Sequence, residues 1–391
     1  MTESAAGPAL PPAERQAAEA LLADAWGERT EIRAAEAIWD RSHVVRLHLG
    51  ADRSVVLKRR GDQEPGVQDW SLEIELAALE YLNAMPVPVA PRLLAADPDV
   101  GILLMEDLGP GASLADSLLT GQRGQAEADL IAYARALGSL HAWSTQRPDE
   151  LAELRARYAP GAMTGTMWMS RLESRKDAFL GAVATLGRPV GAARDEINEL
   201  GATLNATGFH GLVHGDACPD NVRIVDGRCR IFDFETSGWG PVALDAVYLL
   251  APFPTCWCFA RLPAEVAAPA VDAYRARLAA AGIDPGPDWE AALAAALAGW
   301  IIIRGDLVAR LLDKDPEWGT TTMRPRLLTW LRSFIEVAGR TGALPRLRAL
   351  AMMLDDQLSL RWPDTVVPDY PALARPGSAS VDLPDWWHPN L

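Results

Sequence analysis

The feature that most constrains how this chain folds is a predicted β-hairpin in the middle of the sequence. Two extended runs, 222–225 and 228–232, are separated only by Asp226-Gly227, the dipeptide most typical of a two-residue type I′ turn. Facing residues in such a hairpin lie roughly 5 Å apart. A two-residue turn fixes the register of both strands, so the sequence predicts which side chains meet at the open end.

Polar side chains gather at that open end. The register places Asn221 opposite Phe232 and therefore next to Asp233, while Asp216, which follows His214-Gly215, lies on the preceding loop. A carboxylate and an amide oxygen that meet beside a second carboxylate suit a hard cation that prefers oxygen ligands, such as Mg²⁺. We therefore assign Asn221 and Asp233 to a metal ion and leave Asp216 for the substrate.

This stretch resembles the catalytic and metal-binding signature of the aminoglycoside phosphotransferase family, small-molecule kinases with the protein-kinase fold. His214-Gly215-Asp216 with Asn221, followed by I-F-D-F at 231–234, carries the resemblance. It implies an α+β, protein-kinase-like two-lobed fold, with an antiparallel sheet plus helix in a small N-lobe and a large, mainly helical C-lobe. The alternative is a surface hairpin that happens to contain acids, since short motifs carry a false-positive risk.

A lysine and a glutamate upstream of the hairpin are predicted to pair. Lys58 ends an extended run, and taken alone it would be interpreted as a solvated charge at a strand end. In the helix predicted over 71–84, leucines lie three residues before Glu75 and four and seven after it, so Glu75 is on the apolar face. A buried carboxylate needs a cation, and Lys58 is the obvious candidate. Glu73 shares its face with Glu80 and is expected to point to water.

The resemblance assigns nucleotide-binding roles in the first third of the chain. In the family, a strand lysine holds the α and β phosphates and a helix glutamate steadies it, and we carry these roles to Lys58 and Glu75. Adenine is expected against the Glu106 carbonyl and the Leu108 amide. Ser42 falls in the loop that covers the phosphates, where it offers a hydroxyl and a main-chain amide, although this loop lacks the glycines of the protein-kinase pattern.

The resemblance also divides the chain into four parts. These are an N-lobe (1–105), a hinge (106–109), a helical C-lobe with the catalytic loop and substrate-binding helices (110–365), and a C-terminal tail (366–391). Helices are predicted over 125–144, 264–281, 289–312, 326–339 and 344–362, with two or three more between 148 and 208. Trp386 and Trp387 suggest that the tail docks on the rest of the protein.

Three further residues near the catalytic loop receive expectations. His141 is expected to be a packed core residue, and His214 to shape the loop rather than transfer protons. Asp245 stands where the family usually has an aspartate that braces the catalytic loop. A simple acid at a helix N-terminus explains Asp245 equally well.

Composition limits the partners and the compartment. The formal net charge of −15 argues against nucleic acid as the main partner; it suits a cationic substrate, although acidity also keeps a protein soluble. The longest nearly apolar run, 291–303, is shorter than the roughly twenty residues that cross a membrane, and the amino end has no signal-peptide pattern. We expect a cytoplasmic protein.

The four cysteines are too few for a disulfide scaffold in a chain of this size. Cys256-Trp257-Cys258 is a pair without partners in the sequence pattern, and we expect no metal there.

The function implied by the resemblance is transfer of the γ-phosphate of ATP or GTP, with Mg²⁺, to a hydroxyl of a small molecule, an aminoglycoside or a related antibiotic. Asp216 would orient the acceptor hydroxyl and take its proton. Two alternatives stay open: a metabolic kinase for choline, homoserine or a sugar, and a catalytically dead nucleotide-binding module. The sequence leaves the acceptor, the choice of nucleotide and the oligomeric state undetermined.

Overall fold

The computed structural model describes residues 10–38, 43–50, 53–61, 69–163, 165–187, 189–206, 208–251, 253–286, 288–304, 306–375, 381, 383–384 and 387. Two residues singled out in the sequence, Ser42 and Trp386, lie outside the described residues.

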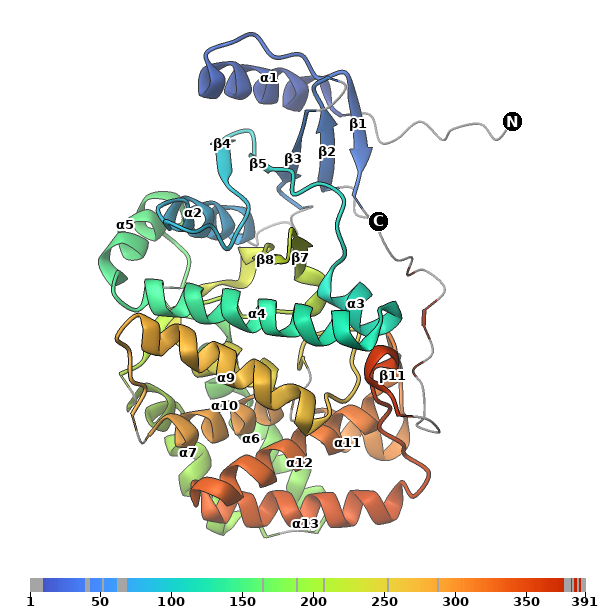
Figure 1. The fold of residues 1–391 in the computed structure, drawn as a ribbon. Helices are drawn as coiled ribbons and strands as arrows, with labels where there is room; N and C mark the ends of the chain where they lie inside the picture. The colour runs from blue at the N-terminus through green and yellow to red at the C-terminus, as the bar shows by residue number, and fades with distance from the viewer. Residues whose placement is uncertain are drawn as a thin grey trace.

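The N-lobe is a five-stranded antiparallel sheet with a helix on each face (Figure 1). Its strands, in the spatial order β1-β2-β3-β5-β4, are β1 (Ala34–Ala37), β2 (Val44–His48), β3 (Ser54–Arg59), β5 (Ile102–Glu106) and β4 (Leu93–Asp97). Helix α1 (Pro12–Trp26) buries Ala18 and Leu22 against one face of the sheet, and α2 (Ser71–Asn83) covers the other. Strand β4 has no counterpart in the sequence prediction. Successive side chains of β2 and β3 point to opposite faces of the sheet, and Val45, Leu47, Val55 and Leu57 share the face that packs with α1.

The C-lobe is mainly helical and lies below the N-lobe in Figure 1. Its longer helices are α3 (Leu114–Thr120), α4 (Arg123–Ser144), α5 (Pro148–Tyr158), α6 (Met167–Thr185), α7 (Gly191–Ala206), α9 (Ala264–Ala280), α10 (Trp289–Ile303), α11 (Asp306–Asp313), α12 (Met323–Thr341) and α13 (Pro345–Arg361). Short elements are α8 (Ala243–Ala246), η1 (Pro219–Asn221), η2 (Phe234–Thr236), η3 (Val247–Leu249), η4 (Pro371–Leu373) and the two-residue strands β10 (Glu317–Trp318) and β11 (Thr321–Thr322).

The single helix predicted over 289–312 is wrong, because the structure has two helices there, α10 and α11. The sequence has Gly305 at the break, and glycine is a poor helix former. Helix α10 is buried on nearly all sides and packs against α6, α7, α8 and α12. In the described part of the chain no single helix is long and apolar enough to span a membrane. Among the described residues, only the bent pair α10–α11, taken together, has the length and composition of a membrane span.

Two short strand pairs belong to the C-lobe. Strand β6 (His210–Val213) pairs with β9 (Gly238–Pro241), and β7 (Val222–Val225) pairs with β8 (Arg228–Ile231). The second pair is the predicted hairpin in its predicted register, with Val225 opposite Arg228 and the Phe232 amide donating to the Asn221 carbonyl at 2.9 Å. Asp226 and Gly227 have φ values of 49° and 69°, the left-handed conformation at both positions that a type I′ turn requires.

The loop between β6 and η1 is held from behind by Asp245 on α8. Its fully buried carboxylate accepts the main-chain amides of His214 at 2.6 Å and Gly215 at 3.0 Å. His141, also fully buried, lies 3.3 Å from the same carboxylate through Nε2. The structure thus confirms that Asp245 braces the loop and that His141 is packed in the core.

Replacing this carboxylate by its isosteric amide tests the brace. In Asp245→Asn one main-chain amide keeps an oxygen acceptor while the other meets an NH₂ group, so a buried donor is left unsatisfied. We expect the free energy of unfolding to fall by about 1–3 kcal/mol, measured by chemical denaturation. Asp356→Asn, at an exposed position of α13, is the control; equal stability of the two variants would contradict the brace.

Candidate active site

The Lys58 side chain is surrounded by three carboxylates. Its Nζ lies 2.5 Å from Glu75 Oε2, 2.5 Å from Asp233 Oδ1 and 2.8 Å from Glu235 Oε2. The Lys58 and Glu75 side chains are only 7% and 1% exposed. The predicted pairing of Lys58 with Glu75 is confirmed, and Lys58 belongs to the central strand of the sheet rather than to a solvated edge.

Each member of this cluster is positioned by its own element. Strand β3 presents Lys58 on the face that α2 covers, and the apolar stripe of α2 turns Glu75 toward it. Asp233 follows β8 with a left-handed backbone, φ 69°, which aspartate tolerates better than most residues. That conformation starts the single turn η2, on which Glu235 lies. Sequence reasoning missed Glu235, because its approach to Lys58 depends on this turn.

The cluster carries more negative than positive charge. Burial would lower the pKa of Lys58, but the attraction of Glu75, Asp233 and Glu235 outweighs it and holds that pKa well above its usual value. Burial raises the pKa of Glu75 to about 7 despite the opposing effect of Lys58. One ammonium thus faces three carboxyl groups whose oxygens lie within 4.8 Å of one another. An all-oxygen set with surplus negative charge fits a divalent cation such as Mg²⁺.

Asp216 lies on the other side of the hairpin's open end, in a network of donors. Its Oδ1 accepts from Thr255 Oγ1 and from Cys218 Sγ at 3.0 Å. Asn221 Nδ2 donates to the Asp216 carbonyl at 2.9 Å and lies 3.3 Å from Oδ2. Burial raises the pKa of Asp216, although the bonds from Cys218 and Thr255 act in the opposite direction. The carboxylate is therefore more basic than an exposed aspartate.

His214 shapes the loop that carries Asp216, as the sequence predicted. Its Nδ1 accepts the Asp216 main-chain amide at 3.2 Å, which leaves Nε2 as the donor to the Phe232 carbonyl at 2.9 Å. The ring thereby links the loop to the end of the hairpin. Sequence reasoning missed Thr255, which reaches Asp216 from a loop 39 residues away, because no local pattern connects the two segments.

The two predicted metal ligands contact different partners in this structure. Asn221 is bonded to Asp216, whereas Asp233 is bonded to Lys58. Their joint assignment to one ion stays a prediction.

The predicted hinge follows β5 and is held by side chains. The Glu106 carboxylate accepts from Arg230 at 2.5 Å and from the Arg92 amide at 3.1 Å. Asp107 accepts from Arg46 Nε at 2.7 Å and Ser54 Oγ at 2.6 Å. The segment is thus fixed to both lobes, while the adenine-binding roles of the Glu106 carbonyl and the Leu108 amide stay predictions.

One expectation for α2 is wrong. Glu73 does not point to water but is buried, 4% exposed, and forms an ion pair with Arg60. The helix pattern alone could not show this, because Arg60 follows β3 and reaches α2 through the fold.

A protein-family comparison gives one match over most of the chain. Residues 31–295 match the model of the phosphotransferase enzyme family. No curated protein matches the chain.

Solved structures of small-molecule kinases resemble the chain at low identity. Choline kinase from Cryptosporidium parvum Iowa II is 13% identical, with 81% of this chain and 93% of that chain covered and a TM-score of 0.48. A putative fructosamine-3-kinase from Thermobifida fusca YX-ER1 is 14% identical, with 86% and 98% covered and a TM-score of 0.44. Macrolide 2′-phosphotransferase type I is 14% identical, with 89% and 98% covered and a TM-score of 0.41.

The family match spans both lobes and contains Lys58, Glu75, Asp216 and Asp233. Its range starts before the N-lobe sheet and ends within α10, so it includes every element that positions these side chains. On that match, this chain belongs to the phosphotransferase enzyme family and has its two-lobed α+β fold.

Proposed function

We propose that this protein transfers the γ-phosphate of ATP or GTP to a hydroxyl group of a small molecule, with Mg²⁺ as cofactor. The observation that carries the proposal is the pair of sites at the open end of one hairpin. A buried lysine with surplus carboxylates lies on one side, and a basic aspartate lies on the other. Phosphoryl transfer needs charge neutralisation and positioning more than covalent catalysis, and these two sites supply both.

The nucleotide phosphates compete with Asp233 and Glu235 for Lys58. Glu75, on the same lobe as Lys58, keeps the ammonium in place while its other partners exchange. Asp233, with Asn221 and Glu235, would hold Mg²⁺, which would neutralise negative charge on the phosphates. Glu106 and Leu108 provide the main-chain groups for adenine. Ser42 belongs to the same proposal, as a contact of the phosphates.

Asp216 receives the acceptor hydroxyl. Thr255 and Cys218 engage Oδ1, while Asn221 approaches Oδ2 at the longer distance of 3.3 Å. Oδ2 is thus the oxygen with more capacity to accept a further hydrogen bond. Because burial raises the pKa of this carboxyl, it can take the hydroxyl proton as the acceptor oxygen bonds to the γ-phosphorus. The bond from that phosphorus to the nucleoside diphosphate breaks in the same step, and the diphosphate leaves.

The acceptor class we propose is a cationic alcohol, an aminoglycoside or a related antibiotic. The formal net charge of −15 supports it, because an acidic protein attracts cations to its surface. A metabolic alcohol such as choline is also cationic and is the second candidate. Homoserine and sugars lack this electrostatic argument.

A coupled assay of nucleotide consumption with a panel of aminoglycosides, macrolides, choline, homoserine and sugars tests the proposal. We expect Mg²⁺-dependent phosphorylation of at least one panel member. If the protein neither hydrolyses nucleotide nor phosphorylates any member, the enzyme function is wrong. Expression in an antibiotic-sensitive host separates the two acceptor classes, since no gain of resistance would favour the metabolic kinase.

Asp216→Asn should abolish most of the transfer without loss of nucleotide binding. The amide keeps the shape of the side chain but cannot take a proton, so we expect kcat to fall roughly 10²–10⁴-fold. Asp226→Asn, in the hairpin turn, is the matched control, because asparagine also tolerates a positive φ. Equal kcat in the two variants would exclude Asp216 as the base.

The pH dependence of kcat/KM should report the environment of Asp216. Burial raises its pKa, so activity should be lost on acidification at a pH above the usual aspartate range, as the carboxylate becomes protonated. The Thr255 hydroxyl stabilises the ionised form, so Thr255→Val should raise the pKa further and move the acidic limb to higher pH. Thr255→Ser keeps the hydroxyl and should retain the wild-type limb. An unchanged limb in Thr255→Val would contradict this assignment.

A further inference from the structure

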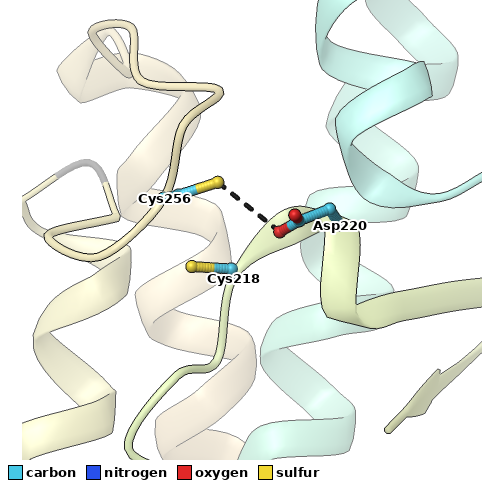
Figure 2. Close-up of side chains that lie close together, drawn as sticks. All are labelled: Cys218, Asp220 and Cys256. Atoms are coloured by element: carbon cyan, nitrogen blue, oxygen red, sulfur yellow. Dashed lines mark hydrogen bonds between the residues drawn. The ribbon is translucent and has the colours of Figure 1, made fainter. Parts of the chain in front are cut away.

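The fold gives Cys256-Trp257-Cys258 the partners that its sequence pattern lacked. Cys218, from the loop that carries Asp216, and Asp220, on the turn η1 that follows it, lie against Cys256 (Figure 2). One ligand atom from each of Cys218, Asp220 and Cys256 lies within 4.8 Å of the other two. The expectation that this cysteine pair stands without partners is therefore wrong.

Two residues of this cluster, Asp220 and Cys256, are held in place by hydrogen bonds from Trp257 and Arg326, which are not members of the cluster. The indole Nε1 of Trp257 donates to Asp220 Oδ2 at 2.7 Å, so Oδ1 is the oxygen that faces Cys256. The guanidinium of Arg326, fully buried, donates to the main-chain carbonyls of Cys256 at 2.6 Å and Trp257 at 2.9 Å. Oriented carboxylates and fixed backbone of this kind are typical of the surroundings of metal ligands.

The spacing of these atoms fits a small tetrahedral ion. Cys256 Sγ and Asp220 Oδ1 are 3.5 Å apart. Two ligands of a tetrahedral Zn²⁺, with bonds of about 2.3 Å to sulfur and about 2.1 Å to oxygen, would be roughly 3.6 Å apart. A thiol is a weak donor, and so a poor partner for a carboxylate held toward it. Cys218 and Cys256 are 2% and 1% exposed, so the sulfurs are shielded from solvent.

We propose that Cys218, Asp220 and Cys256 bind a zinc ion that fastens the Asp216 loop to the segment 255–258. Cys258 Sγ lies 2.6 Å from Cys256 Sγ, closer than the roughly 3.8 Å that separates two thiolates on one tetrahedral zinc ion, so Cys258 is left out of the ligand set. Thiolate ligands select Zn²⁺ over Mg²⁺, which separates this site from the all-oxygen cluster around Lys58. Cys218 would coordinate zinc instead of donating to Asp216, and Thr255 would remain as the hydroxyl donor to that carboxylate. The proposal does not depend on which reaction the protein catalyses.

The position of the site also links it to the C-terminal tail. The Trp257 ring, which holds Asp220, lies 6.0 Å from the ring of Trp387 between centroids. Trp387 is 5% exposed, so the tail docks there, as the sequence suggested. The ion would thus stabilise a junction between the catalytic loop, the 255–258 segment and the tail.

Metal analysis of the full-length protein tests the proposal. The protein is purified under reducing conditions without chelator, and its zinc content is measured by elemental (inductively coupled plasma) mass spectrometry. We expect about one zinc ion per chain in the wild type and loss of that ion in the Cys218→Ser/Cys256→Ser double variant. Cys229→Ser removes a buried thiol elsewhere in the core and should retain the ion.

Cobalt exchange gives a second readout that needs no variant. Co²⁺ bound by two thiolates produces a thiolate-to-metal charge-transfer band, which excess Mg²⁺ should not remove and excess Zn²⁺ should. Wild-type protein that contains no zinc and shows no such band would overturn the proposal. So would full zinc content in a folded double variant, or a disulfide among Cys218, Cys256 and Cys258 in protein handled without oxygen.

Discussion

The buried ammonium group of Lys58 is the interaction on which the site depends. Lys58 and Glu75 come from the N-lobe, whereas Asp233 and Glu235 follow the hairpin of the other lobe, and all three carboxylates lie within 2.8 Å of Nζ. A buried charge is costly unless it is paired, so this contact favours an arrangement in which the lobes meet at Lys58. In the proposed function, nucleotide phosphates would replace the contacts from Asp233 and Glu235, and nucleotide binding would thereby be coupled to the junction of the lobes.

The hairpin also explains why the Lys58 cluster and the hydrogen bonds around Asp216 lie close together. Asp233 follows one strand, and Asn221, bonded to Asp216, precedes the other. His214 connects the loop that carries Asp216 to the hairpin, and Asp245 fixes that loop from the core. A shift of the hairpin by one residue would displace the carboxylate beside Lys58 and the amide beside Asp216 together. Both groups of contacts therefore depend on the stability of this short hairpin.

The parts of this arrangement that the sequence predicted are those set by local geometry. Asp226-Gly227 fixes the hairpin register, and the leucine spacing of α2 places Glu75 on the face toward Lys58. Contacts between distant segments could not be predicted in this way. Glu73 pairs with Arg60, which follows β3, and Thr255 reaches Asp216 from a separate loop.

The same limit applied to the cysteines, since Cys256 meets Cys218 and Asp220 only in the folded chain. The helix or turn that contains a residue shows which way its side chain points. The residue that the side chain then meets depends on which other element packs against that helix or turn. The fold class was predicted from the resemblance of the motifs to a known family, whereas the full charge balance of the site could not be predicted from the sequence.

If the Lys58 cluster holds nucleotide phosphates and Mg²⁺, calorimetric titration with a non-hydrolysable ATP analogue should show binding that strengthens when Mg²⁺ is added and is lost in Lys58→Met. Lys314→Met, at an exposed position outside the site, should bind the analogue as the wild type does. Binding that is equally strong without Mg²⁺ and unaffected by Lys58→Met would exclude this role for the cluster.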